Sequence, residues 1–304
     1  MSLTVVIPTH NRVALLGGAI RSVLASPLIR SPQDVIVVDD QSDDQTPAVA
    51  RELGVRYLRV AAGGPSGSRN AGLALSDTPF VSFLDDDDEW LPGNMRQQFE
   101  ALERNPQAAF AFGRVQRTTF DLQPFGAPIP ATALPSGNIL SFVEYYALQV
   151  GSILFRRSTL VAVGGFDESL RFNEDSDLLV RLASGYPAIG IDVVGSLFRQ
   201  RPPNARDAAL RWPTHRARNA AIQKWRRCGI QIPLRARLRS ELNYRGMTSY
   251  SFCEDAATVL ASGEMRAAAL ALVRGLWISP LHALVGHRRF WTVLPSLSRA
   301  LVRH

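Results

Sequence analysis

The sequence contains few of the features that mark several large classes of protein. It has 2 cysteines, Cys228 and Cys253, in 304 residues, which argues against a disulfide framework and fits a reducing cytosol. No run of 18 uncharged apolar residues occurs, so we expect no membrane-spanning helix. The first 12 residues lack a basic region followed by a long apolar one, so we expect no signal peptide. These absences favour a cytoplasmic globular protein, and a hydrophobic content of 46% agrees.

Charge is unevenly distributed along the chain. Residues 1–204 hold 17 Lys or Arg and 22 Asp or Glu, a net charge of −5, whereas residues 205–304 hold 17 and 5, a net charge of +12. A basic C-terminal third indicates an anionic partner such as a phospholipid surface or a phosphorylated substrate. Nucleic acid is a poor candidate for this partner, because the sequence contains no recognisable pattern of a nucleic-acid-binding module. The segment 266–277 and the aromatic residues after it suit a phospholipid interface, the alternative being a helical region packed on the first domain.

Short apolar runs alternate with segments of helical spacing over the first 120 residues. Such alternation with short connectors predicts βαβ units, a mostly parallel sheet and helices on both of its faces, an α/β fold. We expect a first domain at 1–204, with an irregular excursion at 120–138, and a second, basic and helical region at 205–304. The expected strands are 4–8, 35–39, 55–60, 80–84, 108–112, 151–156 and 188–194, and the expected helices are 13–25, 46–53, 66–75, 93–104, 139–148, 174–184 and several after 213.

Polar residues follow three of the expected strands, where open α/β sheets bind ligands. The fourth strand ends in Asp85-Asp86-Asp87-Asp88-Glu89. Neighbouring carboxylates repel by about 1–3 kcal/mol per near pair at an effective dielectric of 20–80, and a bound cation relieves this repulsion most easily. Carboxylates without a nearby cysteine favour Mg²⁺ or Mn²⁺, commonly shared with a substrate diphosphate. The alternative is a solvated acidic turn before the next helix.

Six short motifs then occur in order between residues 3 and about 201. The motifs are VIPTHNR at 6–12, VVDDQS at 37–42, RNAG at 69–72, FLDDDD at 83–88, GGFD at 164–167 and NED at 173–175. Together they resemble the motifs of the family 2 glycosyltransferases. This resemblance implies a Rossmann-like GT-A fold and a nucleotide-diphosphosugar donor, with a UDP-sugar favoured.

The resemblance implies a donor-binding role for residues on three loops. Asp40 would accept a hydrogen bond from the base, its alternative being a helix N-cap. Ser66 and Arg69, with Ser68, would hold an anion near a helix N-terminus, unless they only form a turn. The remaining residues would line the nucleoside pocket or contact the donor through the DxD-type motif, and they are Pro8, Thr9, His10, Arg12, Asp39, Asp85 and Asp86.

The resemblance also implies a metal site and a catalytic base. Asp87 would contact the metal directly, with Asp85 on the ribose or the metal. Asp175 would remove the proton of the acceptor hydroxyl in a single displacement that inverts the anomeric carbon, with Glu174 and Asp177 as rivals. A first-turn acid that favours the helix dipole is the alternative for Asp175.

The predicted function is therefore an inverting, metal-dependent hexosyltransferase of bacterial surface polysaccharide synthesis. The acceptor would be a glycan or a lipid-linked hydroxyl, such as an undecaprenyl-diphosphate intermediate, reached at the inner face of the cytoplasmic membrane. Arg201 stands about where members often carry a metal-binding His, which motivates the alternative of a catalytically decayed nucleotide-sugar-binding or scaffold protein. A nucleotidyltransferase lacks support because the 8–12 turn is not a Gly-rich phosphate loop, and a glycoside hydrolase would not explain the polar strand ends.

Overall fold

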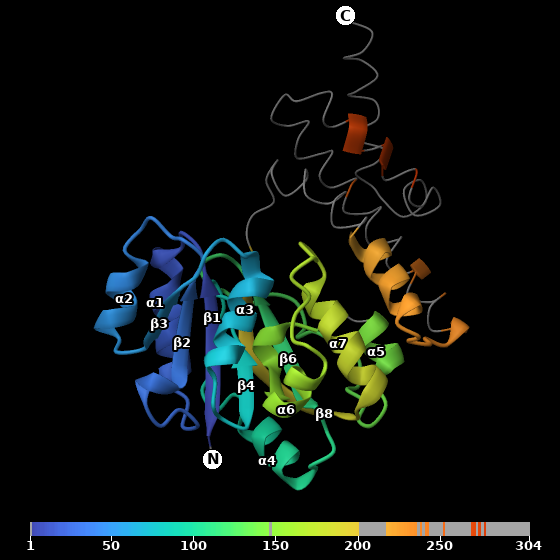
Figure 1. The fold of residues 1–304 in the computed structure, drawn as a ribbon, viewed down its shortest axis with the longest axis horizontal. Coiled ribbons are helices and arrows are strands. Elements are labelled where there is room, and N and C mark those ends of the chain that lie inside the picture. Colours follow the sequence, from blue (N-terminus) through green and yellow to red (C-terminus); the bar gives the residue numbers. More distant parts are fainter. Residues whose placement is uncertain are drawn as a thin grey trace, which may run out of the picture. The chain divides into compact units, whose positions relative to one another are not determined.

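The chain divides into two compact units, Met1–Arg201 and Pro202–His304. The computed structural model describes residues 2–145, 148–200 and 217–235, and beyond these residues 238, 241–242, 252, 269–271, 273–274 and 277. The first unit is a single sheet with helices packed on it (Figure 1). No helix among the described residues is both long and apolar enough to span a bilayer.

The sheet of the first unit has eight strands in the order β3-β2-β1-β4-β7-β6-β8-β5. The pairs β3–β2, β2–β1, β1–β4 and β6–β8 are parallel, and the pairs involving β7 or β5 are antiparallel. The predicted mostly parallel α/β sheet is thereby confirmed. The strands are β1 (Leu3–Thr9), β2 (Val35–Asp39), β3 (Arg56–Arg59), β4 (Phe80–Phe83), β5 (Glu89–Trp90), β6 (Phe110–Thr118), β7 (Ile153–Arg156) and β8 (Ala188–Arg199).

Seven α-helices of the first unit connect these strands. Their start points follow local signals: Pro47 and Pro65 lie in the first turns of the second and third helices, where a missing N–H costs nothing. The helices are α1 (Val13–Leu24), α2 (Thr46–Glu52), α3 (Gly64–Leu75), α4 (Arg96–Arg104), α5 (Leu140–Tyr145), α6 (Arg157–Ala162) and α7 (Glu174–Gly185).

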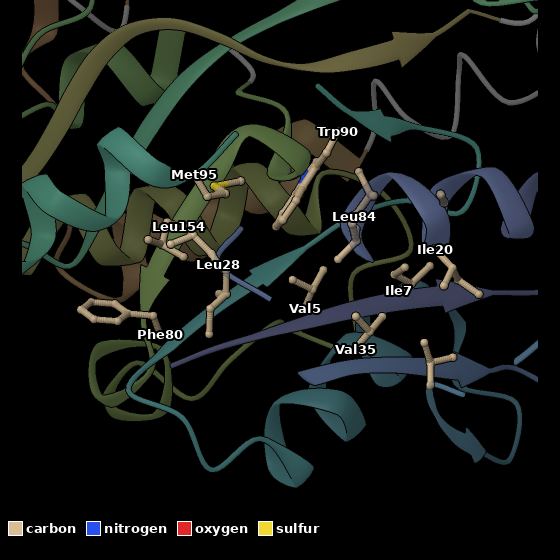
Figure 2. Close-up of a cluster of buried hydrophobic side chains, with 14 of the residues drawn as sticks. Val5, Ile7, Ile20, Leu28, Val35, Phe80, Leu84, Trp90, Met95 and Leu154 are labelled. Atoms are coloured by element: carbon tan, nitrogen blue, oxygen red, sulfur yellow. The ribbon is translucent and has the colours of Figure 1, made fainter. Parts of the chain in front are cut away.

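Alternate residues of β1 pack against different layers, as the two-residue period of a strand requires. Val5 and Ile7 join the cluster that includes Ile20 of α1, and Figure 2 shows these side chains together above the sheet. Val6 points to the opposite layer and meets Gly72 of α3. Both faces of β1, β2 and β4 are therefore covered, and every residue of these strands is buried.

The observed elements differ from the predicted ones mainly after residue 88. The strand expected to end at Val194 continues to Arg199, and its last part pairs with the unpredicted β5. A further unpredicted helix, α6, follows β7. In the second unit residues 217–227 are helical, as are most other described residues beyond 233, and the rest of the helices expected there lie outside the described residues.

We predict that Gly72→Ala destabilises the protein, because an alanine Cβ would lie 2.3 and 2.8 Å from the two Cγ atoms of Val6. Overpacking of this kind costs about 1–3 kcal/mol. Gly67 of the same helix is the matched control, since its nearest neighbour would be 3.8 Å away, and Gly67→Ala should stabilise by up to about 1 kcal/mol. Urea unfolding measures both, and equal effects would contradict the close packing of α3 on β1.

Candidate active site

A cleft of about 440 Å³ opens at the carboxyl ends of β1, β2 and β4. The strand order reverses between β1 and β4, because β2 and β3 extend the sheet on one side of β1 and β4 begins the other. Such a switch point leaves a crevice at the strand ends, where α/β proteins bind ligands. The cleft is lined by Pro8, Thr9, His10, Arg12, Asp40, Gly64, Pro65, Ser68, Arg69, Asp85, Asp86, Asp87, Glu174, Phe198 and Arg199.

Most of the predicted site residues line this one cleft. The exceptions are Asp39, Ser66 and Asp175. Asp39 is fully buried and accepts hydrogen bonds from the Tyr57 hydroxyl (2.6 Å) and the Ser42 amide (2.8 Å), so it holds the loop after β2 in place. Ser66 is buried inside α3, and its hydroxyl has no hydrogen-bond partner.

The loops after β1 and β2 are tied to each other. His10 Nδ1 lies 2.6 Å from the carbonyl oxygen of Asp40, and the Asn11 amide donates to the Ser42 hydroxyl at 2.8 Å. Asn11 and Gln41 both adopt left-handed backbone conformations, with φ of 53° and 62°. These contacts set the wall of the cleft that the sequence predicted as the nucleoside pocket.

Asp40 lines the cleft and also holds the start of α3. Its two carboxylate oxygens accept from the amides of Gly63 and Gly64, at 3.0 and 3.1 Å. These two residues are the N-cap and the first residue of α3, where backbone N–H groups lack partners within the helix. Asp40 therefore binds the first amides of α3 from a separate loop, whereas the N-cap residues of α2 and α3 are Gln45 and Gly63. A carboxylate has about four lone-pair sites, so the contact with a base remains open to it.

Arginines surround the acidic run. Arg12 contacts Asp86 at 2.8 Å and Asp87 at 3.3 Å, and the Thr9 hydroxyl donates to Asp86 at 2.7 Å. Burial raises the pKa of Asp86 to about 6, against the opposing effect of Arg12. We expected a bound cation to relieve the repulsion among these carboxylates. The positive charge of Arg12 already reduces it.

The end of the run is fixed by β8. Arg199 donates its backbone N–H to the Asp88 carboxylate at 2.9 Å and its Nε to the Asp87 carbonyl at 2.7 Å. Asp88 is buried outside the cleft lining, and burial together with the charge of Asp85 raises the pKa of Asp88 to about 8. Phe198 and Arg199 also line the cleft, because the strand expected to end at Val194 continues to Arg199.

Arg69 is the most deeply buried cation of the cleft, with a side chain 5% exposed. It donates to Asp85 at 2.7 Å and to Glu174 at 3.0 Å, and its guanidinium lies 5.3 Å from the ring centre of Phe166. Burial disfavours its charged form, but the charges of Asp85 and Glu174 outweigh burial and raise the pKa of Arg69. One side chain of α3 thereby links the end of β4 to the start of α7.

Asn70, next to Arg69 in the RNAG motif, contacts the GGFD motif. Its side chain accepts from the Phe166 amide at 2.9 Å and donates to the Phe166 carbonyl at 2.8 Å. Gly165 has a φ of +66°, and a Cβ there would lie 2.6 Å from the Asn70 oxygen. Only glycine fits this position, so the RNAG and GGFD motifs are two halves of one contact.

The three acids at the start of α7 have different environments. Glu174 lines the cleft beside Arg69. Asp175 is half-buried, and burial together with the charge of Glu174 raises the pKa of Asp175. Asp177 is fully buried and accepts from Arg181 at 2.8 Å. Since Arg181 also donates to the carbonyls of Val163 and Gly165, Asp177 supports the GGFD loop and is a poor candidate for the base.

The carboxylates of the cleft are compatible with a divalent cation that also binds substrate phosphates. Asp85 and Asp87 both line it, and Mg²⁺ needs only one or two carboxylates beside phosphate and water. Within the part of the chain that the structure describes, no cluster of three or more His, Cys, Asp or Glu forms a complete metal site. Arg201, the position of the family's frequent His, lies outside the described residues.

Comparison with known proteins agrees with this geometry. Residues 4–145 match the family model described as "Glycosyl transferase family 2". Similar curated proteins are the succinoglycan biosynthesis proteins ExoU (31% identity over 60% of this chain) and ExoW (37% over 34%) of Rhizobium meliloti. A GalNAc(5)-diNAcBac-PP-undecaprenol beta-1,3-glucosyltransferase of Campylobacter jejuni is 36% identical over 36% of this chain. These matches cover 57%, 34% and 37% of the relatives' own lengths.

Solved structures of S. aureus TarS share the fold. One covers 93% of this chain and 54% of TarS, with a TM-score of 0.55 and 15% identity. Another, with a TM-score of 0.52, is a complex of TarS with UDP-GlcNAc. At this identity the likeness shows the GT-A fold alone. Residues 4–145 of the chain are therefore similar to glycosyl transferase family 2, in agreement with the motifs and with the cleft.

Proposed function

We propose that the protein is an inverting, metal-dependent hexosyltransferase that uses a nucleotide-diphosphosugar, a UDP-sugar in the first place. The observation that carries the proposal is the meeting, in one cleft, of the loops after β1 and β2, the carboxylates after β4 and Glu174 at the start of α7, which precedes Asp175 directly. The two loops suit a nucleoside, and the carboxylates after β4 suit a diphosphate with a cation. The start of α7 suits an acceptor hydroxyl. The complex of TarS with UDP-GlcNAc on the same fold supports the choice of donor.

Each end of the cleft has its own role in this proposal. Pro8, Thr9, His10 and Asp40 line the nucleoside end, and Arg12 lies between them and the acidic run. Asp85 and Asp87 would hold Mg²⁺ or Mn²⁺, which when bound balances the charge of the departing nucleotide diphosphate. Arg69 keeps Asp85 in place through its 2.7 Å contact.

Asp175 is the proposed base. A carboxylate whose pKa is raised toward the working pH accepts a proton more readily than an ordinary aspartate. Glu174 forms an ion pair with Arg69 at 3.0 Å, so its carboxylate is already engaged in holding Arg69. Attack of the acceptor oxygen on the anomeric carbon forms one bond and breaks the bond to the nucleotide diphosphate, while Asp175 takes the hydroxyl proton.

The acceptor is proposed as a glycan or a lipid-linked hydroxyl in bacterial surface polysaccharide synthesis, reached at the inner face of the cytoplasmic membrane. The relatives support this choice through their names, which refer to succinoglycan, to an undecaprenol-linked glycan and, for GgaA of Bacillus subtilis, to minor teichoic acid. The matched segments cover under two thirds of the lengths of the first two relatives, so the acceptor of this chain is a proposal.

The second candidate is a decayed nucleotide-sugar-binding or scaffold protein. Its supporting observation is that arginines already contact Asp85, Asp86 and Asp87. Incubation with UDP-, GDP- and dTDP-sugars in the presence of Mn²⁺, scored for donor hydrolysis, separates the two. We expect turnover with a UDP-sugar, whereas binding without turnover of any donor would favour the scaffold.

We predict that Asp87→Ala removes the Mn²⁺-dependent part of UDP binding, because it deletes a carboxylate from the diphosphate end of the cleft. Calorimetric titration of UDP with and without Mn²⁺ measures the effect. Asp192→Ala is the control, since its carboxylate pairs with Arg114 and lies outside the cleft lining. Retention of full Mn²⁺-dependent affinity in Asp87→Ala would refute the metal assignment.

We predict that Asp175→Asn lowers kcat by about 10²–10⁴-fold and leaves UDP affinity unchanged. In the wild type, kcat should fall as the pH drops through the pKa of Asp175, because only the ionised carboxylate is a base. The raised pKa places this fall above the ordinary value of about 3.9. Glu174→Gln is the comparison variant. If it abolishes transfer while Asp175→Asn keeps the wild-type rate and pH profile, the base is Glu174.

A further inference from the structure

Two groups of described residues in the second unit are helical and carry exposed apolar side chains. Leu234, Leu238 and Leu242 are spaced by four residues and are 59%, 53% and 63% exposed. Described residues of this segment are helical, and a four-residue spacing places side chains on one face of a helix. We call these three residues the leucine stripe.

The second row follows the same rule further along the chain. Leu270, Val273 and Trp277 are 48%, 61% and 71% exposed and lie at helical positions. Their spacing of three and four residues again places them on one face. This tryptophan stripe includes a residue type that prefers the boundary between an apolar and a wet environment.

Positive charge lies near the leucine stripe. Arg226, Arg227 and Arg235 are exposed, and residues 205–304 as a whole carry a net charge of +12. Leu238 and Arg226 also line one hollow of about 270 Å³, so apolar and cationic groups share a recess. Glu241 lines the same hollow as Leu238, and it accepts from Arg218 at 2.9 Å.

We infer that the leucine and tryptophan stripes form a binding surface for an anionic phospholipid bilayer. An apolar face of Leu and Trp beside arginines is the pattern of a helix that lies in the plane of a membrane interface. The apolar rows enter the acyl boundary, and the arginines bind the phosphate groups of the anionic lipids. A neutral protein partner would leave the arginines without a counter-charge, so the charge favours the lipid.

Vesicle sedimentation of the full chain tests the inference. We expect binding to phosphatidylcholine vesicles that contain about 30% phosphatidylglycerol, weak binding to phosphatidylcholine alone, and a clear loss of binding between about 0.1 and 1 M salt. Leu238→Asp and Trp277→Asp should each lower the partition coefficient about tenfold or more. Leu238→Gln, which adds no charge, should lower it less than Leu238→Asp.

The matched control is Val161→Asp, which places the same charge at an apolar residue 54% exposed in the first unit, and it should bind vesicles like the wild type. Equal binding by the wild type, Leu238→Asp and Trp277→Asp would overturn the inference. So would a dimer in sedimentation equilibrium that dissociates on Leu238→Asp without vesicle binding, because a second copy would then cover the stripe. A UDP titration of the same variants reports on the proposed function separately, since vesicle binding requires no donor.

Discussion

The ion pairs of Arg69 are the interaction on which the cleft depends. A guanidinium that is 5% exposed has lost most of its hydration, at a cost of several kcal/mol for a buried ion. Two carboxylates on separate elements, Asp85 after β4 and Glu174 at the start of α7, offset that cost. Neither carboxylate is local to Arg69 in sequence, so the three elements are held together only in the folded sheet. The diphosphate end of the cleft and the end proposed for the acceptor therefore share one cation.

The position of the Arg69 guanidinium depends on the close packing of the residues around it. Asn70 binds both backbone groups of Phe166, Gly72 lets α3 lie against Val6, and Arg181 holds the carbonyl of Gly165 from α7. The GGFD loop is thus fixed from two helices, and it supplies the ring beneath Arg69. The acidic run of β4 is compensated in the same way by Arg12 and by Arg199. A divalent ion would enter a site whose repulsion is already largely balanced, and its affinity would then depend on the diphosphate that accompanies it.

The sequence was sufficient to predict features that depend on local pattern. Continuous apolar runs predicted the strands from β1 to β4, and the polar residues after them predicted where the cleft lies. Contacts between residues that are far apart in the sequence leave no such local pattern. Nothing near Asp40 indicates that it accepts from Gly63 and Gly64, and nothing near Asp177 indicates its burial against Arg181. The sequence predicted that the last strand ends at Val194, whereas β8 pairs with β5 at Ser196 and Leu197 and continues to Arg199, which lines the cleft.

The two parts of the chain are under different physical constraints. The first unit concentrates carboxylates at strand ends and compensates them with arginines inside one cleft, and this is the part that the family model matches, through residue 145. The second unit lies beyond that match, so relatives say little about its partner. Its excess of arginines has few carboxylates to pair with, because residues 205–304 contain 5 Asp or Glu against 17 basic residues. Exposure of an apolar row beside excess positive charge is unfavourable in water. Contact with an anionic surface removes this free-energy cost. In our proposals, the shared motifs of the first unit supply the donor chemistry, whereas charge and exposure in the second unit supply the membrane contact.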